Sequence, residues 1–187
     1  MIYHLKTPIT EETVRNLRTG DILYLSGEMV TARDDAHKRL VREGISPEID
    51  LRGKILYHCG PIVKGKEVLA AGPTTSMRME DYEADFIEKT GVGIIVGKGG
   101  MGPKTKDACA KFGAVHCVFP GGCAVVAAEK MGDVQNVIWG DLGMPEAMWI
   151  FDADEFGPVI VNIDTAGGDL MEANGKEFRS EISKRGK

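Results

Sequence analysis

The stretch Ile94-Ile95-Val96-Gly97-Lys98-Gly99-Gly100-Met101-Gly102, IIVGKGGMG, reads as a short apolar strand that runs into a glycine loop carrying one lysine. Pro103 follows directly and suits the first turn of a helix, where no intrahelical bond needs a backbone N–H. The stretch therefore predicts a strand, a tight loop and a helix in succession, which is the repeating unit of α/β domains.

The same alternation continues along the 187-residue chain. Strands are expected at 21–25, 54–58, 93–96, 114–118, 134–139 and 158–163, and helices at 11–18, 33–43, 79–90, 103–112 and 122–131. The Pro- and Gly-rich segment 60–73 is expected to be an internal loop, and 168–187 a polar C-terminal helix or tail. With 43% hydrophobic residues and no long linker, residues 1–187 are predicted to form a single α/β domain.

Charge and hydropathy exclude two classes of partner. The 23 basic and 28 acidic residues give a net charge of −5, so no broad basic surface is expected to bind nucleic acid. No run approaches the roughly 18 apolar residues of a membrane span, and the start, MIYHLKTPITEE, lacks a signal pattern. We expect a cytoplasmic protein with no membrane contact, in which an anion meets a few placed cations.

The glycine loop matches G-x-G-x-x-G, the dinucleotide fingerprint, but lacks its other requirements. The acidic residue that should hold a ribose about 20 positions onward is missing, since residues 118–123 contain no carboxylate. What remains is an anion site: glycines allow close approach, the following helix offers its positive end, and Lys98 adds a charge. The alternative is a tight strand-to-helix turn with a solvated lysine.

Two further loops concentrate polar chemistry at the start of a helix. Residues 71–79 place three hydroxyls, of Thr74, Thr75 and Ser76, beside Arg78, which suits binding of a carboxylate; the alternative is simple helix capping. Arg33 and His37 are four apart and share a helix face, so they could address one bound molecule. The alternative there is a solvated helix start in which Arg33 pairs with a nearby acid.

The remaining histidines, cysteines and carboxylates carry weaker signals. His58 and His116 lie in expected strands and fit core histidines with satisfied hydrogen bonds. The four cysteines show neither a CxxC pair nor the spacing of a zinc or iron–sulfur site, so buried free thiols and no metal site are expected. The acidic run 152–155 is expected to be a solvated turn.

Taken together and in this order, the loops resemble the β subunit, or C-terminal-type domain, of two-subunit class I fumarate hydratases and L(+)-tartrate dehydratases. The resemblance spans nearly the whole chain. It rests on Thr7-Pro8-Ile9, Asp21-Ile22-Leu23-Tyr24-Leu25-Ser26-Gly27, Thr31-Ala32-Arg33-Asp34-Asp35-Ala36-His37, Tyr57-His58-Cys59-Gly60-Pro61, Gly72-Pro73-Thr74-Thr75-Ser76-Met77-Arg78-Met79, Gly97-Lys98-Gly99-Gly100-Met101 and Pro120-Gly121-Gly122.

The resemblance implies a swivelling β/β/α domain, similar to the mobile domain of aconitase-like enzymes. It implies an iron–sulfur hydro-lyase whose [4Fe-4S] cluster is bound by a partner α subunit and not by this chain. The expected partners are therefore that α subunit and a small dicarboxylate, within a homo-oligomer of αβ units. A Rossmann-type nucleotide-binding module and a non-catalytic scaffold subunit are the alternatives.

Carried over residue by residue, the resemblance assigns roles within the site. Arg33, Arg78 and Lys98 bind substrate carboxylates, with Thr75 and Gly99 also at the substrate. Thr74 is the candidate base and His37 a further catalytic candidate. An unassisted threonine is a poor proton acceptor, whereas histidine titrates near neutral pH, so the base stays open between these two. The expected reaction is reversible hydration of fumarate to L-malate, with dehydration of L(+)-tartrate to oxaloacetate as the alternative.

Overall fold

A sheet of seven strands organises the computed structural model, which describes residues 1–44 and 49–185. The strands run in the order β1 (Ile2–Lys6), β2 (Ile22–Thr31), β3 (Ile55–Tyr57), β6 (Ile94–Gly97), β7 (Val115–Val118), β9 (Met148–Ile163) and β8 (Met131–Ile138). The first five are parallel, and β9 runs antiparallel to its neighbours. Because β9 also pairs with β2, the pairings of β2, β3, β6, β7 and β9 close into a ring.

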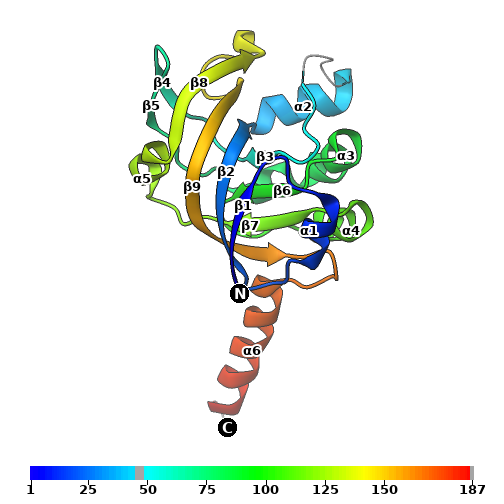
Figure 1. Ribbon diagram of the computed structural model, residues 1–187. Coiled ribbons are helices and arrows are strands. Elements are labelled where there is room, and N and C mark those ends of the chain that lie inside the picture. The colour runs from blue at the N-terminus through cyan, green and yellow to red at the C-terminus, as the bar shows by residue number, and fades with distance from the viewer. Residues whose placement is uncertain (45–48, 186–187) are drawn as a thin grey trace.

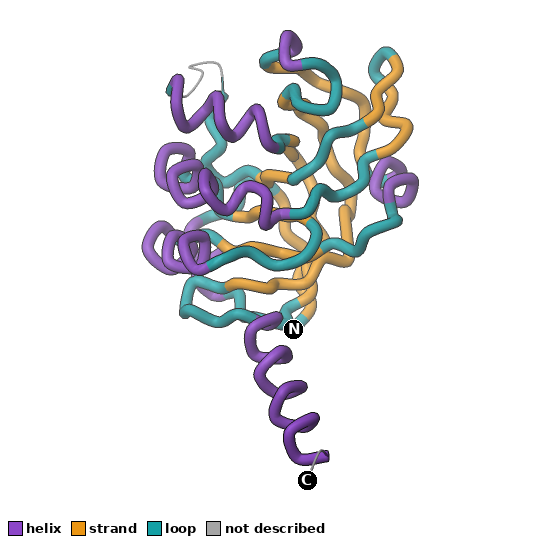
Figure 2. The backbone as a smooth tube through the Cα atoms, turned by 180° about the vertical axis from the view of Figure 1, so that it is seen from behind, coloured by secondary structure: helices purple, strands orange, loops and turns teal. Residues whose placement is uncertain are grey.

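Helices cover one side of this ring as a layer (Figures 1 and 2). This layer holds α2 (Asp34–Glu43), α3 (Glu80–Thr90) and α4 (Pro103–Phe112), with α1 (Glu11–Asn16) below it in Figure 1. On the other side lie α5 (Ala124–Glu129) and the hairpin of β4 (Ile62–Lys64) and β5 (Glu67–Ala70). Two 3₁₀ turns, η1 (Ser76–Met79) and η2 (Gly140–Leu142), complete the connections.

The alternation of side chains along each strand produces two apolar cores. Ile55 and Tyr57 of β3 point into the core enclosed by the ring, whereas Leu56 between them packs under the helix layer. In β6, Ile94 packs into the inner core and Ile95 into the outer one. Strands with both faces buried read as continuous apolar runs, which is why the central strands were predictable.

The mixed α/β prediction is confirmed, with corrections at several elements. The segment 60–73 is not a loop, because it contains the β4–β5 hairpin. The acidic run 152–155 is not a solvated turn but part of β9, in which exposed Asp152 and Asp154 flank buried Ala153. β1 was missed altogether. The polar C-terminal segment forms a helix, α6 (Leu170–Arg185).

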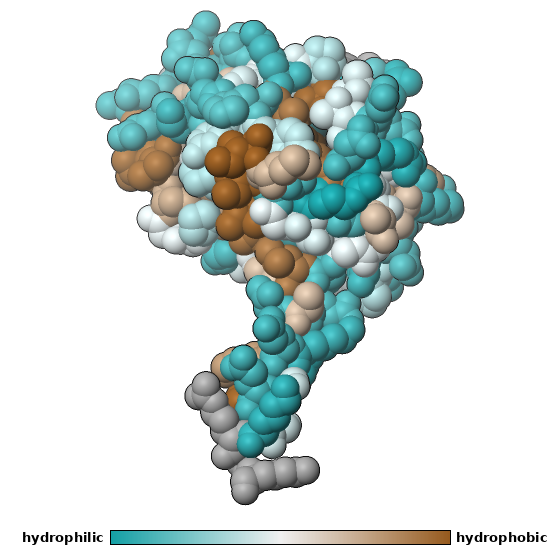
Figure 3. Space-filling model, turned by 60° about the horizontal axis from the view of Figure 1, so that its bottom comes forward, coloured by the Kyte–Doolittle hydropathy of each residue, from teal (hydrophilic) through white to brown (hydrophobic). Residues whose placement is uncertain are grey.

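The helix α6 leaves the body at the lower end of the molecule in Figure 1. Figure 3 shows hydrophilic residues over most of its visible face and a band of apolar side chains on the body near its base. None of the helices in the described part of the chain is both long and apolar enough to cross a membrane.

Candidate functional site

Two of the predicted site loops are joined through their backbones at the carboxyl ends of β3 and β6. The Lys98 N–H donates to the Thr74 carbonyl at 3.0 Å, and the Ser76 N–H donates back to the Lys98 carbonyl at 2.9 Å. Thr74 is tied in turn to the end of β3, since its N–H donates to the His58 carbonyl at 2.6 Å. Thr74 is partly exposed, and Thr75 and Lys98 are exposed, so the side chains of this ladder are accessible.

Within residues 1–44 and 49–185, the Lys98 amine forms no ion pair. An exposed, unpaired cation is compatible both with the predicted anion site and with the alternative of a solvated lysine. Gly99 follows with φ of +75°, a left-handed conformation that favours glycine. This turn directs the chain away from the sheet beside the exposed lysine.

The positive end of α4, in contrast, is not offered to a ligand. The carboxylate of Glu80 accepts the N–H of Gly102 at 2.8 Å and that of Lys104 at 2.9 Å, and it also accepts the Thr105 hydroxyl at 2.6 Å. An internal carboxylate therefore satisfies the helix N-terminus. That part of the sequence argument for an anion site was wrong.

Arg33 and Arg78, from different loops, meet at one carboxylate. Asp34 lies 3.3 Å from Arg33 Nε, and it accepts from Arg78 Nε at 2.9 Å with Arg78 Nη2 at 2.8 Å from its second oxygen. Glu146 lies 2.9 Å from Arg33 Nε. Arg33 thus pairs with nearby acids, as the alternative interpretation expected, while among the described residues its two terminal nitrogens donate no hydrogen bond.

Two opposing effects act on Asp34. Partial burial on its own raises its pKa, but a hydrogen bond from its own backbone and the charges of Arg78 and Arg33 bring the pKa below its ordinary value. Asp34 is therefore ionised at neutral pH, and its Oδ2 contacts both arginines. The side chain of Arg78 remains 49% exposed.

His37 lies behind Arg33 and has no exposed surface. Its Nδ1 lies 2.9 Å from the Arg33 carbonyl, and its Nε2 lies 3.2 Å from Glu83, which is also completely buried. The ring stacks on Phe86 with centroids 4.5 Å apart. His37 is thus adjacent to a predicted substrate-binding residue, but its ring contacts the protein interior.

The four cysteines do not gather into a metal site. Cys59, Cys109 and Cys117 are buried, and burial raises the pKa of each thiol. Among the described residues, the one group of three or more His, Cys, Asp or Glu side chains placed to share a metal ion is His37, His58 and Glu83. This donor set contains no thiolate and does not fit an iron–sulfur cluster, whose ligands are thiolates.

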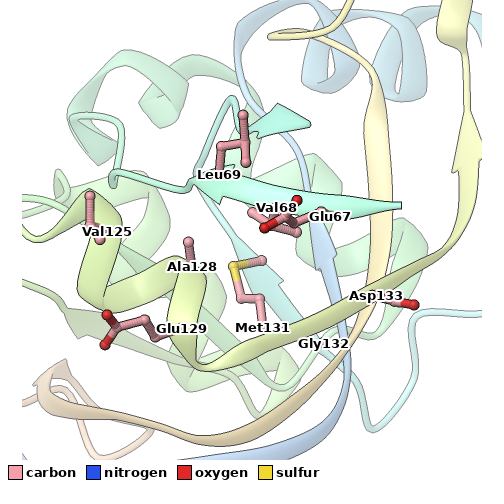
Figure 4. Close-up of a pocket in the computed structure, with 9 residues that line it drawn as sticks. All are labelled: Glu67, Val68, Leu69, Val125, Ala128, Glu129, Met131, Gly132 and Asp133. Atoms are coloured by element: carbon pink, nitrogen blue, oxygen red, sulfur yellow. The ribbon is translucent and has the colours of Figure 1, made fainter. Parts of the chain in front are cut away.

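A pocket of about 360 Å³ lies between β5, α5 and the start of β8 (Figure 4). None of the predicted site residues lines it, and its charged side chains are the three carboxylates of Glu67, Glu129 and Asp133. This charge is unsuitable for a dicarboxylate. A larger groove of about 800 Å³ runs between Met77, the glycine loop and the base of α6, and none of the predicted site residues lines it either.

Sequence reasoning missed the roles of Glu83, Ser76 and Asp34. A signal for Glu83 was present: the buried positions of α3 and the turn before it, 79, 83, 86, 87 and 90, have helical spacing, and Glu83 is the one carboxylate among them. A carboxylate on an apolar stripe needs buried partners. His58 and His116 are fully buried, as expected of core histidines, but their hydrogen bonds are not all satisfied, since His58 Nε2 and His116 Nδ1 have no hydrogen-bond partner among the described residues.

The comparisons with known proteins cover nearly the whole chain. The family model described as "Fumarase C-terminus" matches residues 2–174. The chain is 49% identical over 178 residues to the L(+)-tartrate dehydratase subunit beta of Escherichia coli, covering 93% of this chain and 89% of that protein. It is 40% identical to a putative L(+)-tartrate dehydratase subunit beta of Methanocaldococcus jannaschii, covering 94% of each chain.

A third relative is a longer protein. The chain is 39% identical over 184 residues to a putative fumarate hydratase class I of Geobacillus stearothermophilus, covering 96% of this chain and 35% of that protein. The family model covers most of this chain, and the two beta subunits match along most of their own length as well. The chain therefore belongs to the family described as Fumarase C-terminus, together with the β subunits of two-subunit hydro-lyases of the class I fumarate hydratase type.

Proposed function

We propose that this chain is the β subunit of a hydro-lyase that adds water to, or removes it from, a four-carbon dicarboxylate at a site completed by an α subunit. The observation that carries the proposal is the ladder between Thr74 and Lys98, which places a hydroxyl-bearing loop beside an accessible cation. Arg78 lies in η1, four residues after Thr74, and contacts Asp34 together with Arg33. The names of the relatives, all dehydratases or hydratases, support the same reaction class.

Arg33, Arg78 and Lys98 are proposed to bind the substrate carboxylates. Removal of a proton beside a carboxylate increases the negative charge on that carboxylate in the transition state. Fixed cations placed where this charge develops accelerate the reaction more than cations that only bind the ground state. Asp34 and Glu146 orient Arg33 through Nε and leave its terminal nitrogens for the ligand. Thr75 and Gly99 flank this surface.

Thr74 is proposed as the base that takes the proton from the carbon next to a carboxylate, and His37 remains the competing candidate. The accessibility of Thr74 supports direct contact with substrate. The complete burial of His37 instead supports an effect through Arg33, whose carbonyl it contacts. The nearby cations would stabilise an alkoxide at Thr74.

The proposal places a [4Fe-4S] cluster on the α subunit, where it would supply a Lewis acid for departure of hydroxide from the neighbouring carbon. The buried cysteines of this chain, which are not gathered, support that placement. A domain that swivels against its partner, like the mobile domain of aconitase-like enzymes, would bring the loops at the sheet edge to the cluster. Pairing of αβ units into a homo-oligomer is part of the same proposal.

Two substrates fit this chemistry. Loss of water from L-malate gives fumarate, and loss of water from L(+)-tartrate gives the enol of oxaloacetate. The sequence alone favoured fumarate, whereas the names of the two β subunits, which match over most of their own length, favour L(+)-tartrate as the first substrate to test. The additional hydroxyl of tartrate would be recognised within the shared site, where each of the two chains contributes surface.

The test is reconstitution. This chain is co-expressed with a cluster-bearing α subunit, purified anaerobically, and assayed with L(+)-tartrate, fumarate and L-malate against each chain alone. The proposal predicts dehydratase or hydratase activity that neither chain has by itself. Equal activity of the α subunit without this chain would reject the proposed role, and inactivity of the complex toward all three acids would reject the substrate class.

A further inference from the structure

Glu83 is a completely buried carboxylate in α3 that contacts two buried histidines. One of its oxygens, Oε2, lies 3.2 Å from His37 Nε2 and 3.0 Å from His58 Nε2. All three side chains have no exposed surface. Burying an isolated carboxylate costs several kcal/mol, so such a group is retained only with charged or hydrogen-bonded partners. Its two partners come from separate elements, α2 and the end of β3.

Each histidine uses its other ring nitrogen to hold part of the proposed site. His37 Nδ1 lies 2.9 Å from the Arg33 carbonyl, at the start of α2. His58 Nδ1 lies 3.0 Å from the hydroxyl of Ser76, which follows Thr74 and Thr75 in the same loop. The same hydroxyl lies 3.0 Å from His116 Nε2 in β7. One carboxylate therefore connects Arg33 to the loop that carries Thr74.

The chemistry of donors and acceptors fixes where the protons lie. A carbonyl oxygen only accepts, so His37 Nδ1 carries a proton and donates it to the Arg33 carbonyl. His58 accepts the Ser76 proton at Nδ1, and Ser76 accepts from His116 Nε2–H, which leaves a proton on His58 Nε2, 3.0 Å from Glu83 but not aligned for a hydrogen bond. Burial alone raises the pKa of Glu83, but its interactions with His58 and His37 lower it below its ordinary value.

Gly97 shows how tightly this arrangement is built into the glycine loop. A Cβ at Gly97 would lie 1.9 Å from the Ser76 hydroxyl and 3.0 Å from His58 Nδ1. The glycine that begins the loop therefore makes room for Ser76 and His58, and the next residue is Lys98. Ser76 is further fixed by its N–H, which donates to the Lys98 carbonyl.

We propose that Glu83 is a positioning residue. Through His37 it fixes the position of Arg33. Through His58 and Ser76 it fixes the loop that carries Thr74, and with it the glycine loop at Lys98. This inference rests on the proposed function. It assigns Glu83 no contact with substrate, because its side chain is enclosed between α2, α3 and the sheet. The chain of contacts ends at His116 Nδ1, which is buried without a partner, so it is not a path for protons to solvent.

The same three side chains present donors within 4.8 Å of one another, which is also compatible with a metal ion. The contacts of 3.0 and 3.2 Å bring the two rings to the carboxylate as charge partners, although within the described part of the chain His37 Nε2, His58 Nε2 and both oxygens of Glu83 form no hydrogen bond of good geometry. The proposal assigns the positioning role to these charge contacts without an ion. Metal analysis of the purified complex separates the two, because stoichiometric metal that is lost in Glu83→Gln would overturn the proposal.

The kinetic test uses Glu83→Gln and Ser76→Ala in the αβ complex, with Ile87→Val as control. Ile87 is buried on the same helix but packs only in the outer core. We expect both test variants to lower kcat/KM at least tenfold when equal amounts of folded protein are compared. In both, kcat should fall because Thr74 is displaced. In Glu83→Gln, KM should also rise because Arg33 is displaced. Ile87→Val should lower stability and leave both constants within twofold. Test variants that behave like Ile87→Val would overturn the proposal.

A second readout on the full chain is independent of activity. Imidazole ¹H–¹⁵N NMR should show an Nδ1 proton on His37, donated to the Arg33 carbonyl, and Glu83→Gln should shift the ring nitrogen signals of both His37 and His58. A His37 ring without an Nδ1 proton, or ring signals unchanged in Glu83→Gln, would contradict the network even if the enzyme is active. Conversely, a complex inactive toward all tested acids would reject the proposed function, while this protonation pattern still decides the contacts of Glu83. If Glu83→Gln fails to fold, Ser76→Ala decides the kinetic outcome.

Discussion

The guanidinium of Arg78 contacts the carboxylate of Asp34 through two nitrogens, with Nε 2.9 Å from one oxygen and Nη2 2.8 Å from the other. This two-point contact fixes the plane of the guanidinium, and it joins the turn η1 to the first residue of α2. Arg33 Nε lies 3.3 Å from Oδ2, the same oxygen that Arg78 Nη2 contacts. The relative placement of the two arginines is thus set by an internal anion.

Asp34→Asn tests whether that anion orients the arginines. We expect KM for the dicarboxylate to rise about five- to tenfold, because both arginines lose a charged partner that holds their geometry. Asp35→Asn is the matched control, since Asp35 lies in the same helical turn but is exposed and pairs with Lys38 at 3.0 Å. Steady-state kinetics of the αβ complex measure both. A lower KM in Asp34→Asn would instead mean that Asp34 competes with substrate.

Thr74→Val distinguishes the two candidate bases. The substitution preserves shape and removes the hydroxyl, so we expect kcat to fall by about 100-fold or more with little change in KM, as for loss of a group that acts in the transition state. Thr75→Val, at the next residue, serves as the comparison and should lower kcat less than Thr74→Val does. If Thr74→Val retains kcat while His37→Gln abolishes it in a folded complex, the base assignment passes to His37.

Gly97→Ala tests the packing of the glycine loop against Ser76. A Cβ there would overlap the Ser76 hydroxyl, so we expect a loss of about 1–3 kcal/mol in the free energy of unfolding, the usual cost of overpacking a buried site. Gly100→Ala is the control, because its Cβ would meet the flexible Met171 side chain at 3.1 Å. Urea denaturation compares them, and equal stabilities would show that the loop yields easily.

His116 predicts how stability depends on pH. It is fully buried, and burial, helped by nearby His58, lowers its pKa to about 3, with Glu83 opposing. The unfolded histidine titrates near about 6.5, so between these values the unfolded chain binds a proton that the folded chain does not, and stability falls as pH falls. The lowered pKa of His58 also makes stability fall as pH falls. The lowered pKa of Glu83 contributes a further loss of stability only below about pH 4.3, where the carboxylate of the unfolded chain begins to bind a proton.

Denaturation at pH 7.5 and 5.0 measures this effect. The wild-type chain should lose stability over this interval, and His116→Gln should lose less, because the neutral amide does not titrate. If both proteins lose the same free energy of unfolding between pH 7.5 and 5.0, His116 is not the titrating group.

Strands that are buried on both faces were easier to predict from the sequence than strands with one exposed face. β6, with Ile94, Ile95 and Val96 buried on both faces, was evident as an apolar run. The first part of β9 was missed because Asp152 and Asp154 dominate its composition. Their alternation with buried Ala153 is the pattern of a strand with one exposed face, which a reading by charge overlooks. The closing pair β2–β9 depends on that strand.

The candidate site was predictable only where residues lie close in sequence or match the family. Thr74, Arg78 and Lys98 stood out as polar groups at strand ends. The residues that hold them in place, Asp34, Glu83 and Ser76, did not stand out, because each contacts residues of other elements. Glu83, for example, lies 46 residues from His37 and 25 from His58 in the sequence. Tertiary contacts of this kind carry no local periodicity. The likeness of Glu80 to an ordinary first-turn acid likewise concealed that it caps α4 rather than its own helix.

The account depends most directly on Lys98 and Arg78 as carboxylate-binding cations. The decisive measurement is kcat/KM of the anaerobic αβ complex with L(+)-tartrate and fumarate for Lys98→Ala and Arg78→Ala. Lys104→Ala, an exposed lysine paired with Asp81, is the control. We predict a loss on the order of 100-fold in each site variant, as charged contacts of about 3 kcal/mol imply, and less than about twofold in the control. Site variants with wild-type kinetics would contradict the account and leave the glycine loop as a turn with a solvated lysine.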